Sequence, residues 1–388
     1  MSEIKRLIER LCPEGVEYRK LGEVCEMQRG TSMTRKNAIE GDIPVISGGR
    51  EPAFYINTSN RDGETITVAG SGAGAGYVQY WNKPIFVNDA FSVKGKDTLL
   101  TKYVYYCMKN MQEQITGTQK GGGVPHVHIS SIDGFEIPIP PIEVQSKIVE
   151  ILDNFTELEA ELEAELEARR KQYEYYRNAL LSFDKVGGAE FDVKWMKLGD
   201  ICNNICSGGT PLTSNRSYYE GDIPWLRTQE VDWRDIYDTG IKITYEALNN
   251  SSAKMIPANC VIVAMYGATA AKVAINRIPL CTNQACCNLE INENIALVKF
   301  VYQWLCKEYE KLKALGEGSQ HNINAKKVRS YPIPIPPLSE QQRIVSILDR
   351  FEALTTDLQS GLPAEIEARR KQYEYYREQL LTFERKYA

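Results

Sequence analysis

Residues 137–155, IPIPPIEVQSKIVEILDNF, return at 333–351 as IPIPPLSEQQRIVSILDRF, at an offset of 196 residues. A second segment, ARRKQYEYYR, occurs at 168–177 and again without a change at 368–377, at an offset of 200 residues. A repeat on this scale indicates a duplicated chain. The change of offset means that the second copy holds four more residues between its two motifs.

Both repeated segments predict long helices, because apolar residues recur mostly in steps of three and four. A helix of about 40 residues spans ~60 Å, longer than one small domain, so each helix needs a partner and the other copy is the expected one. The prolines at 138, 140 and 141, and at 334, 336 and 337, are expected to hold the chain extended before each helix begins. Gly361 and Pro363 predict a kink or a break in the second helix.

Residues 157–168 of the first helix are three successive ELEA units. One such unit advances a helix by ~6 Å and rotates it by a net ~40°, so units can be gained or lost while the apolar stripe only drifts. The helix is therefore interpreted as a ruler whose length changes in steps.

The segments before the helices, about 16–136 and 193–332, resemble each other only loosely, through VEYRKLGEV and VKWMKLGDI at their starts and GDIP at Gly41 and Gly221. They contain short β-rich runs such as 64–68 and 260–264, and helical stretches such as 297–315. Each segment is most simply an α+β domain.

The composition is that of a globular chain, with 43% hydrophobic and 25% charged residues and a net charge of -5 among 388 residues. No apolar run reaches the ~18 residues of a membrane span, and residues 1–11 alternate charged and apolar side chains, which predicts a short amphipathic helix and not a signal peptide. The ten cysteines are therefore expected to be reduced thiols in a cytoplasmic protein. Cys202 with Cys206, and Cys281 with Cys286 and Cys287, lack the spacing and nearby histidines of a zinc site, so no metal is predicted.

Two variable domains, each followed by a proline-led helix with P-PP-x3-Q-x2-I at 138–148 and 334–344 and with RRKQYEYYR further on, resemble the specificity (S) subunit of type I restriction-modification systems. The resemblance covers the whole chain. It implies that each variable domain is a target recognition domain for one half of a split, double-stranded DNA sequence. It also implies that the helices form an antiparallel spacer that binds two methyltransferase subunits, to which two restriction subunits can add.

The predicted fold is α+β, with two β-rich target recognition domains separated by two long antiparallel coiled-coil helices in a pseudo-two-fold arrangement. The predicted parts are an N-terminal helix at 1–15 that packs with the C-terminal spacer, recognition domain 1 at 16–136, the central spacer helix at 137–185, recognition domain 2 at 190–332 and the C-terminal spacer helix at 333–388.

No catalytic residue is predicted. The chain lacks the Asn/Asp/Ser-Pro-Pro-aromatic tetrapeptide of an amino-methylating enzyme and a GxxxxGK[ST] phosphate loop, and the SGAGAG run at 71–76 is interpreted as a turn or a close backbone approach. S-adenosylmethionine, ATP and magnesium are thus expected in partner subunits. Two alternatives remain: a stand-alone methyltransferase or nuclease, and a coiled-coil scaffold that does not bind DNA.

The negative charge is local, because residues 137–183 carry 5 Lys+Arg against 10 Asp+Glu, whereas residues 16–136 are balanced and residues 190–332 carry a net +1. A neutral domain can still recognise bases, since base-edge hydrogen bonds give specificity while phosphate contacts mainly supply affinity. This subunit alone is therefore expected to bind DNA weakly.

Polar side chains on glycine-punctuated loops are the candidate DNA contacts, because they can form paired hydrogen bonds with guanine or adenine. They are Arg29, Ser47, Arg50, Lys120 and His126 in the first domain, and Arg227, Thr228, Gln229, Tyr266, Asn283, Gln284, Gln320, His321 and Asn322 in the second. Arginine with tyrosine is a typical interface composition, so a second set is predicted to contact methyltransferase subunits or the opposite helix. This set is Arg169, Arg170, Tyr173 and Tyr176 with their copies Arg369, Arg370, Tyr373 and Tyr376.

Overall fold

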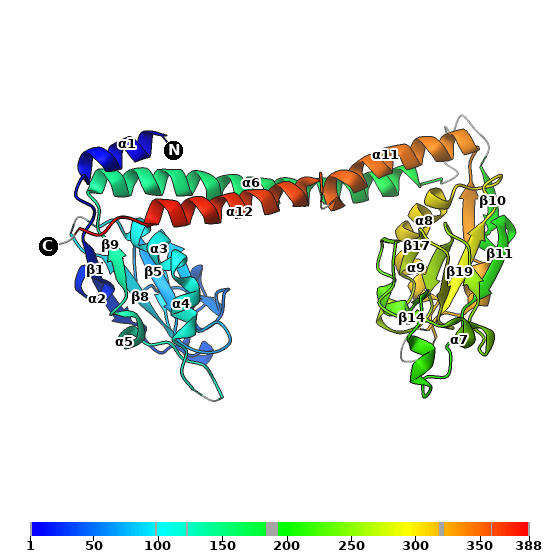
Figure 1. Ribbon diagram of the computed structural model, residues 1–388, viewed down its shortest axis with the longest axis horizontal. Helices are drawn as coiled ribbons and strands as arrows, with labels where there is room; N and C mark the ends of the chain where they lie inside the picture. Colours follow the sequence, from blue (N-terminus) through cyan, green and yellow to red (C-terminus); the bar gives the residue numbers. More distant parts are fainter. Residues whose placement is uncertain are drawn as a thin grey trace. The chain divides into compact units, whose positions relative to one another are not determined.

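A computed structural model describes residues 2–97, 99–121, 123–183, 193–317, 322–357 and 359–386. The chain forms two compact units (Figure 1): unit 1 contains residues 1–164 and 364–388, and unit 2 contains residues 165–363. Each unit combines one β-rich domain with parts of the long helices, and the fold class is α+β, as predicted. The sequence-based domain limits divide the chain differently, at the helix ends, and stay predictions.

Unit 1 contains the first domain, the start of a long helix and the last helix. Its elements are α1 (Ser2–Leu11), β1 (Tyr18–Lys20), α2 (Leu21–Val24), β2 (Cys25–Arg29), η1 (Arg35–Asn37), β3 (Ile43–Ile46), β4 (Phe54–Ile56), β5 (Thr65–Ala69), β6 (Val78–Trp81), β7 (Phe86–Val87), β8 (Ala90–Gly95), α3 (Thr101–Asn110), α4 (Gln112–Gly117), α5 (Ile129–Ile132), β9 (Glu136–Pro138), the first part of α6 (Ile142–Leu180) and most of α12 (Leu362–Leu381).

The first domain is built on a four-stranded antiparallel sheet in the order β2-β8-β5-β6, with a three-stranded sheet β4-β3-β7 beside it. All residues of β5 are buried, which places the β-rich run predicted at 64–68 at the centre of this domain. Helix α3 packs against β5, β6 and β8 through a core that includes Tyr103, Val104 and Met108. These contacts bury the apolar face of the sheet.

Unit 2 repeats this plan with more strands. Its elements are the rest of α6, β10 (Lys194–Lys197), η2 (Leu198–Ile201), β11 (Cys202–Ser207), η3 (Arg216–Tyr219), β12 (Ile223–Leu226), η4 (Thr228–Glu230), β13 (Asp235–Ile236), β14 (Lys242–Ile243), α7 (Tyr245–Asn249), β15 (Met255–Ile256), β16 (Val261–Ala264), η5 (Gly267–Thr269), β17 (Val273–Asn276), β18 (Leu280–Thr282), β19 (Cys286–Ile291), α8 (Val298–Lys307), α9 (Tyr309–Ala314), α10 (Ala325–Arg329), β20 (Pro332–Ile335) and α11 (Leu338–Thr356).

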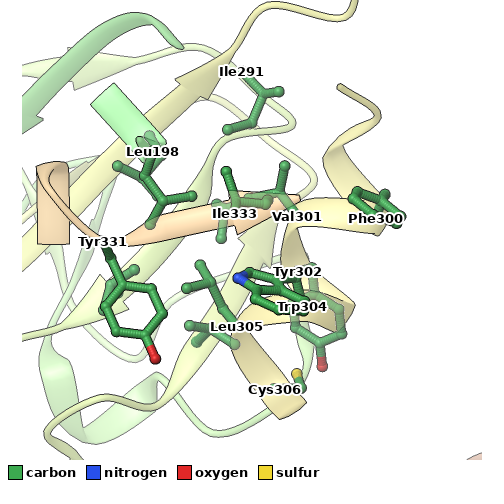
Figure 2. Packing of buried hydrophobic residues seen from close by; sticks show 14 of the residues in the cluster. Leu198, Ile291, Phe300, Val301, Tyr302, Trp304, Leu305, Cys306, Tyr331 and Ile333 are labelled. Carbon is green, nitrogen blue, oxygen red and sulfur yellow. The ribbon is translucent and has the colours of Figure 1, made fainter. Parts of the chain in front are cut away.

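The second domain has a five-stranded sheet β11-β19-β16-β17-β13 and a four-stranded sheet β14-β12-β18-β15. Helix α8 fills the core, where Val301, Trp304 and Leu305 pack with Leu198 and Ile333 (Figure 2). The helical stretch predicted at 297–315 is present but divides into α8 and α9 at Glu308.

The first domain divides at the matching place, Met111 between α3 and α4, so the division belongs to the duplicated scaffold. Glu308 is buried and its carboxylate accepts a hydrogen bond of 2.9 Å from the hydroxyl of Tyr331. A charged group is retained in a core only when such partners satisfy it, so tertiary contacts fix the chain at this residue.

The first repeated segment forms one continuous helix, α6, of 39 residues. The second forms two helices, because α11 ends at Thr356 and α12 begins at Leu362. The break expected from Gly361 and Pro363 is therefore confirmed. It falls within the stretch where the second copy has its four additional residues, so the uninterrupted helix is the one with the ELEA units.

In unit 1 the helices α6 and α12 run antiparallel. Phe155 of α6 packs between Tyr373 and Tyr376 of α12, with ring centroids 6.4 and 5.4 Å away. Further along α6, Glu159 and Glu163 bind Arg370, which lies earlier in α12. Unit 2 contains the matching arrangement, in which Phe351 of α11 packs against Tyr173 and Tyr176 of α6.

A buried glutamine near the start of each repeated helix joins it to its domain. The side-chain oxygen of Gln145 accepts a 3.0 Å hydrogen bond from the Leu100 N–H, which precedes α3, and its amide donates to the Pro140 carbonyl at 2.8 Å. Gln341 repeats this at the start of α11, accepting from the Leu297 N–H at 2.9 Å and donating to the Pro336 carbonyl at 2.9 Å.

These bonds connect three segments through one side chain: the proline segment, the first turn of the long helix and the start of the main helix of the domain. Gln145 and Gln341 are 2% and 0% exposed. A buried amide with all its partners fixes the relative position of those segments, since any other arrangement leaves polar groups unsatisfied.

The two ends of the chain meet in unit 1. The Val16 N–H donates to the Glu384 carbonyl at 2.8 Å, and the Lys386 N–H donates to the Val16 carbonyl at 3.0 Å. Leu7 and Leu11 of α1 pack on the same core as Leu380 and Leu381 of α12. The core of the first domain thus includes residues from both ends of the sequence.

Replacing the buried glutamine by leucine should destabilise the fold. Gln341→Leu leaves the Leu297 N–H and the Pro336 carbonyl buried without their partner, so we expect a loss of about 2–6 kcal/mol of unfolding free energy, at about 1–3 kcal/mol for each unsatisfied group. Chemical denaturation of the purified chain measures it.

The adjacent Gln342 supplies a matched control, because it is exposed and its side-chain amide donates to Ser346 of its own helix. Gln342→Leu should change the unfolding free energy by no more than about 0.5 kcal/mol. Equal losses in the two variants would show that the buried hydrogen bonds do not hold the helix to its domain.

Candidate nucleic-acid interface

In the second domain the candidate residues follow two parallel strands. Strands β12 and β18 pair in parallel through Trp225 with Cys281 and Leu226 with Thr282. Their carboxyl ends lie at one edge, so Arg227, Thr228 and Gln229 after β12 lie near Asn283 and Gln284 after β18. The Asn283 N–H donates to the Leu226 carbonyl at 2.9 Å, which fixes the two segments to each other.

The side chains at this edge are held by local hydrogen bonds. The Arg227 N–H donates to Glu230, Asn283 accepts from the Ala285 N–H, and Gln284 contacts the Thr210 hydroxyl. The Nε atom of Arg227 is buried and has no partner among the described residues. The edge therefore combines positioned amides with a guanidinium that has unused hydrogen-bonding capacity.

Two further candidates, Tyr266 and Asn322, are connected to this edge through η5. The helical turn η5 lies against η4, where the Thr269 hydroxyl donates to the Thr228 carbonyl at 2.9 Å. Tyr266 directly precedes η5 and is 40% exposed, and the Gly267 N–H donates to the Asn322 side chain at 3.4 Å. Gln320 and His321 lie outside the described residues.

The first domain has the equivalent edge at β3 and β7, which pair in parallel through Val45 with Phe86 and Ile46 with Val87. Ser47 follows β3 and Asn88 follows β7. The Asn88 amide donates to the Ser47 hydroxyl at 3.0 Å, while its side-chain oxygen accepts from the Met33 N–H at 2.9 Å. The two domains therefore present corresponding strand ends with different side chains.

Glycines allow the loops of this edge to approach closely. A Cβ atom on Gly48 would lie 2.1 Å from the Ser71 carbonyl oxygen, and one on Gly74 would lie 2.4 Å from the Gly48 carbonyl oxygen. The interpretation of the SGAGAG run as a close backbone approach is therefore confirmed.

A recess of about 370 Å³ opens beside this edge, and Arg29, Asn88, Asp89 and His126 are among its lining residues. The His126 ring stacks on His128 at 6.0 Å with an interplanar angle of 8°. The backbone of Lys120 pairs with His126 in both directions, at 3.0 and 2.9 Å. Four of the five candidates of the first domain, those other than Arg50, thus belong to this region.

Arg50 has a different environment. Its guanidinium carbon lies 5.0 Å from the ring centroid of Tyr77, and its carbonyl accepts a hydrogen bond from Gln79. Helix α3 contributes to the same environment, because the Lys109 ammonium lies 4.7 Å from the centroid of the Tyr77 ring.

Asn88, Asp89 and His128 line the recess but are absent from the set predicted from sequence. Asn88 matches Asn283 in the duplicated sequence, and Asn283 is in the predicted set, so the internal alignment could have identified Asn88. Nothing in the local sequence marks His128, because its place in the recess depends on stacking with His126.

The repeated Arg and Tyr side chains of the helices are partly used within the chain. Arg370 binds Glu159 at 2.6 Å and Glu163 at 2.5 Å, whereas Arg169 and Arg369 bind glutamate and glutamine side chains of their own helices. The four predicted tyrosines pack on Phe155 or Phe351. Contact with the opposite helix is thus present for the tyrosines and for Arg370, while Arg169, Arg170 and Arg369 remain exposed or half-buried.

Burial affects the chemistry of the cysteine thiols in the second domain. Within the described ranges no group of three or more His, Cys, Asp or Glu residues could hold a metal ion. Burial raises the pKa of Cys202 and of Cys287 to about 12, so these thiols are protonated at neutral pH. The described helices also include none that is long and apolar enough to cross a membrane.

Comparison with known proteins agrees with this architecture. Residues 13–168 and 191–368 match the family described as type I restriction modification DNA specificity domain. The specificity subunit of the type I restriction enzyme EcoR124I/EcoR124II from Escherichia coli is 34% identical, over 99% of this chain and 98% of that protein. A putative type I restriction enzyme specificity subunit from Haemophilus influenzae is 31% identical, over 99% of this chain and 100% of its own length.

Solved structures share the fold. The S subunit of a type I restriction-modification system from M. genitalium superimposes with a TM-score of 0.62 at 19% identity, covering 95% of this chain and 96% of that one. The HsdS subunit from Thermoanaerobacter tengcongensis gives a TM-score of 0.50 at 17% identity, covering 96% and 97%.

Proposed function

Because the chain belongs to the family of type I restriction-modification DNA specificity proteins, we propose that it selects a bipartite DNA sequence for a multisubunit complex, with one domain for each half-site. The observation that carries this proposal is the pair of corresponding strand ends, β3 with β7 and β12 with β18, which present different polar side chains on the same scaffold. Equivalent edges with different chemistry are what two different half-sites require.

The side chains at these edges suit base recognition. Arg227 and Gln284 in the second domain stand where the first has Ser47 and Asp89, while Asn88 and Asn283 correspond. Arginine pairs with guanine and glutamine with adenine through two hydrogen bonds, whereas an aspartate accepts from cytosine. The two domains therefore recognise different bases.

The helices are the proposed binding surface for two methyltransferase subunits, to which two restriction subunits can add. Support comes from the identical RRKQYEYYR segments on α6 and α12, in which Arg169 and Arg369 each keep 39% of the side chain exposed. Two copies of one motif suit two copies of one partner.

Catalysis is assigned to those partners. The family is that of DNA specificity subunits, so the proposed role of this subunit is to position DNA. S-adenosylmethionine, ATP and magnesium belong to the partner subunits in this proposal, and the expected location is the cytoplasm.

The assembled complex tests the proposal. When the chain is co-expressed with its methyltransferase subunits, sequencing of methylated DNA should return one split motif. Arg227→Ala should relax the base preference in one half only, by about 1–3 kcal/mol for a lost paired contact. Methylation without a split motif would contradict the proposal, and relaxation in both halves would contradict the assignment of one domain to one half.

The helix motif can be tested by charge reversal. Arg169→Glu with Arg369→Glu should abolish co-purification of the methyltransferase subunits, because each change places a negative charge at the centre of the proposed contact. The control is Lys171→Glu with Lys371→Glu, since two residues along a helix is about 200° and places the lysines on another face. Loss of the partner in the control alone would move the contact to that other face and contradict the assignment.

The ELEA units make a further prediction about spacing. Arg370 binds Glu159 and Glu163, which are the third residues of two successive units, so an added unit supplies an equivalent carboxylate one step further along α6. Inserting one ELEA should therefore keep the helix pair and lengthen the gap between half-sites by about 1–2 base pairs, from ~6 Å of added helix. The methylation motif measures the gap, and an unchanged gap would show that α6 does not set it.

A further inference from the structure

Two cations lie over the Tyr77 ring in unit 1, and a third, Arg377, lies over the neighbouring Tyr373 ring at 5.2 Å. The Arg50 guanidinium and the Lys109 ammonium lie 5.0 and 4.7 Å from the centroid of the Tyr77 ring. Arg377 of α12 joins them through Asn110, the residue after Lys109, whose side-chain oxygen accepts from the Arg377 Nε at 3.2 Å. In the part of the chain that the structure describes, none of these three cations forms an ion pair.

This arrangement is unfavourable for the isolated chain. Lys109 is half-buried, and burial, followed by the charges of Arg377 and Arg50, lowers its pKa. The ammonium and Arg377 also border an open recess of about 790 Å³. The recess contains Glu113, Glu374 and Glu378, but these side chains are exposed and do not pair with the three cations. Like charges held together at an open surface indicate a site for an anion.

The duplicated half of the chain lacks this cluster. Lys109 is the ninth residue of the ten-residue helix α3, and the ninth residue of the ten-residue helix α8 is the buried Cys306. Arg50 follows GDIP at the distance at which Glu230 follows the second GDIP. Only the helix arginine is shared, as Arg177, and its Nε is buried without a partner among the described residues.

We propose that Arg50, Lys109 and Arg377 form a clamp for a phosphate of the DNA backbone, so that the first half of the chain contributes phosphate affinity that the second half does not. The proposal rests on the proposed function. It favours DNA over an acidic protein surface because a partner that docks on both identical helix motifs would need the cluster in both units. It also extends DNA contact from the first domain to α12, which supplies Arg377.

The chemistry fits a phosphodiester. Its two non-bridging oxygens accept hydrogen bonds from guanidinium and ammonium groups, and no base is needed. The domain carries no net charge over residues 16–136, so its phosphate affinity depends on such local clusters.

The test measures DNA binding by the chain assembled with its methyltransferase subunits, across a series of salt concentrations. Two duplexes are used, one with the methylation motif of the complex and one without it. Lys109→Met should lower affinity for both duplexes alike, by about eightfold near 0.1 M salt, and should reduce the slope of log affinity against log salt by about 0.9. Arg50→Gln, at an exposed position, should act in the same direction.

Lys83→Met is the matched control, because Lys83 is an exposed lysine that lies over an aromatic ring, Trp81, in the same domain. It should keep the wild-type slope. Thermal unfolding of Lys109→Met should occur at or above the wild-type temperature, since the change relieves charge repulsion. A lower temperature would show that Lys109 stabilises the fold, which contradicts the clamp.

An unchanged salt slope in both Lys109→Met and Arg50→Gln would overturn the proposal. If the variants lose their methyltransferase subunits but keep the wild-type slope, the cluster binds a protein partner, which also overturns the proposal. Failure of the proposed function looks different. In that case the wild-type complex does not bind the duplex with the motif more tightly than the duplex without it. The clamp is still tested by the salt dependence of binding to the duplex without the motif.

Discussion

A hydrogen-bonded glutamine buried at the start of each repeated helix determines how that helix is joined to its β-rich domain. Gln145 and Gln341 contact both the proline segment before the helix and the backbone N–H that precedes the main helix of the domain. A buried side chain whose oxygen and amide nitrogen are both hydrogen-bonded leaves little freedom between helix and domain. Apolar packing alone would allow the helix to slide, because it is not directional. The candidate DNA-contact edges inherit their position relative to the helix from these bonds.

The duplication made much of the fold predictable from the sequence. The helical stripes, the prolines before them and the break near Gly361 follow from local chemistry and were found as expected. The division of the stretch at 297–315 was not predicted from the sequence, although the first domain divides at the matching place, Met111. The candidate edge was partly predictable. Ser47, Arg227 and Asn283 follow strands, but the place of Arg50 depends on the ring of Tyr77, which no local pattern indicates.

The two halves of the chain keep the same scaffold and differ at their edges and recesses. Phe155 and Phe351 each pack against a matching pair of tyrosines, and Gln145 and Gln341 make matching hydrogen bonds. In contrast, Lys109 of the first half corresponds to Cys306 of the second, and Ser47 corresponds to Arg227. Identity extends from the buried glutamines to exposed side chains of the repeated helices, such as Tyr175 and Tyr375. Difference extends from the side chains at the strand ends to the buried Cys306, so burial alone does not decide which positions are shared.

The closure of unit 1 by both chain ends has a consequence for synthesis on the ribosome. Unit 2 is a continuous stretch, residues 165–363, so all of it has been translated before the last helix is made. Unit 1 needs residues 364–388, since Leu380 and Leu381 belong to its core and Val16 bonds Glu384. The half of the protein that is translated first is therefore the half that is completed last. A nonsense codon within α12 would remove part of the core of the N-terminal domain while leaving the downstream domain whole.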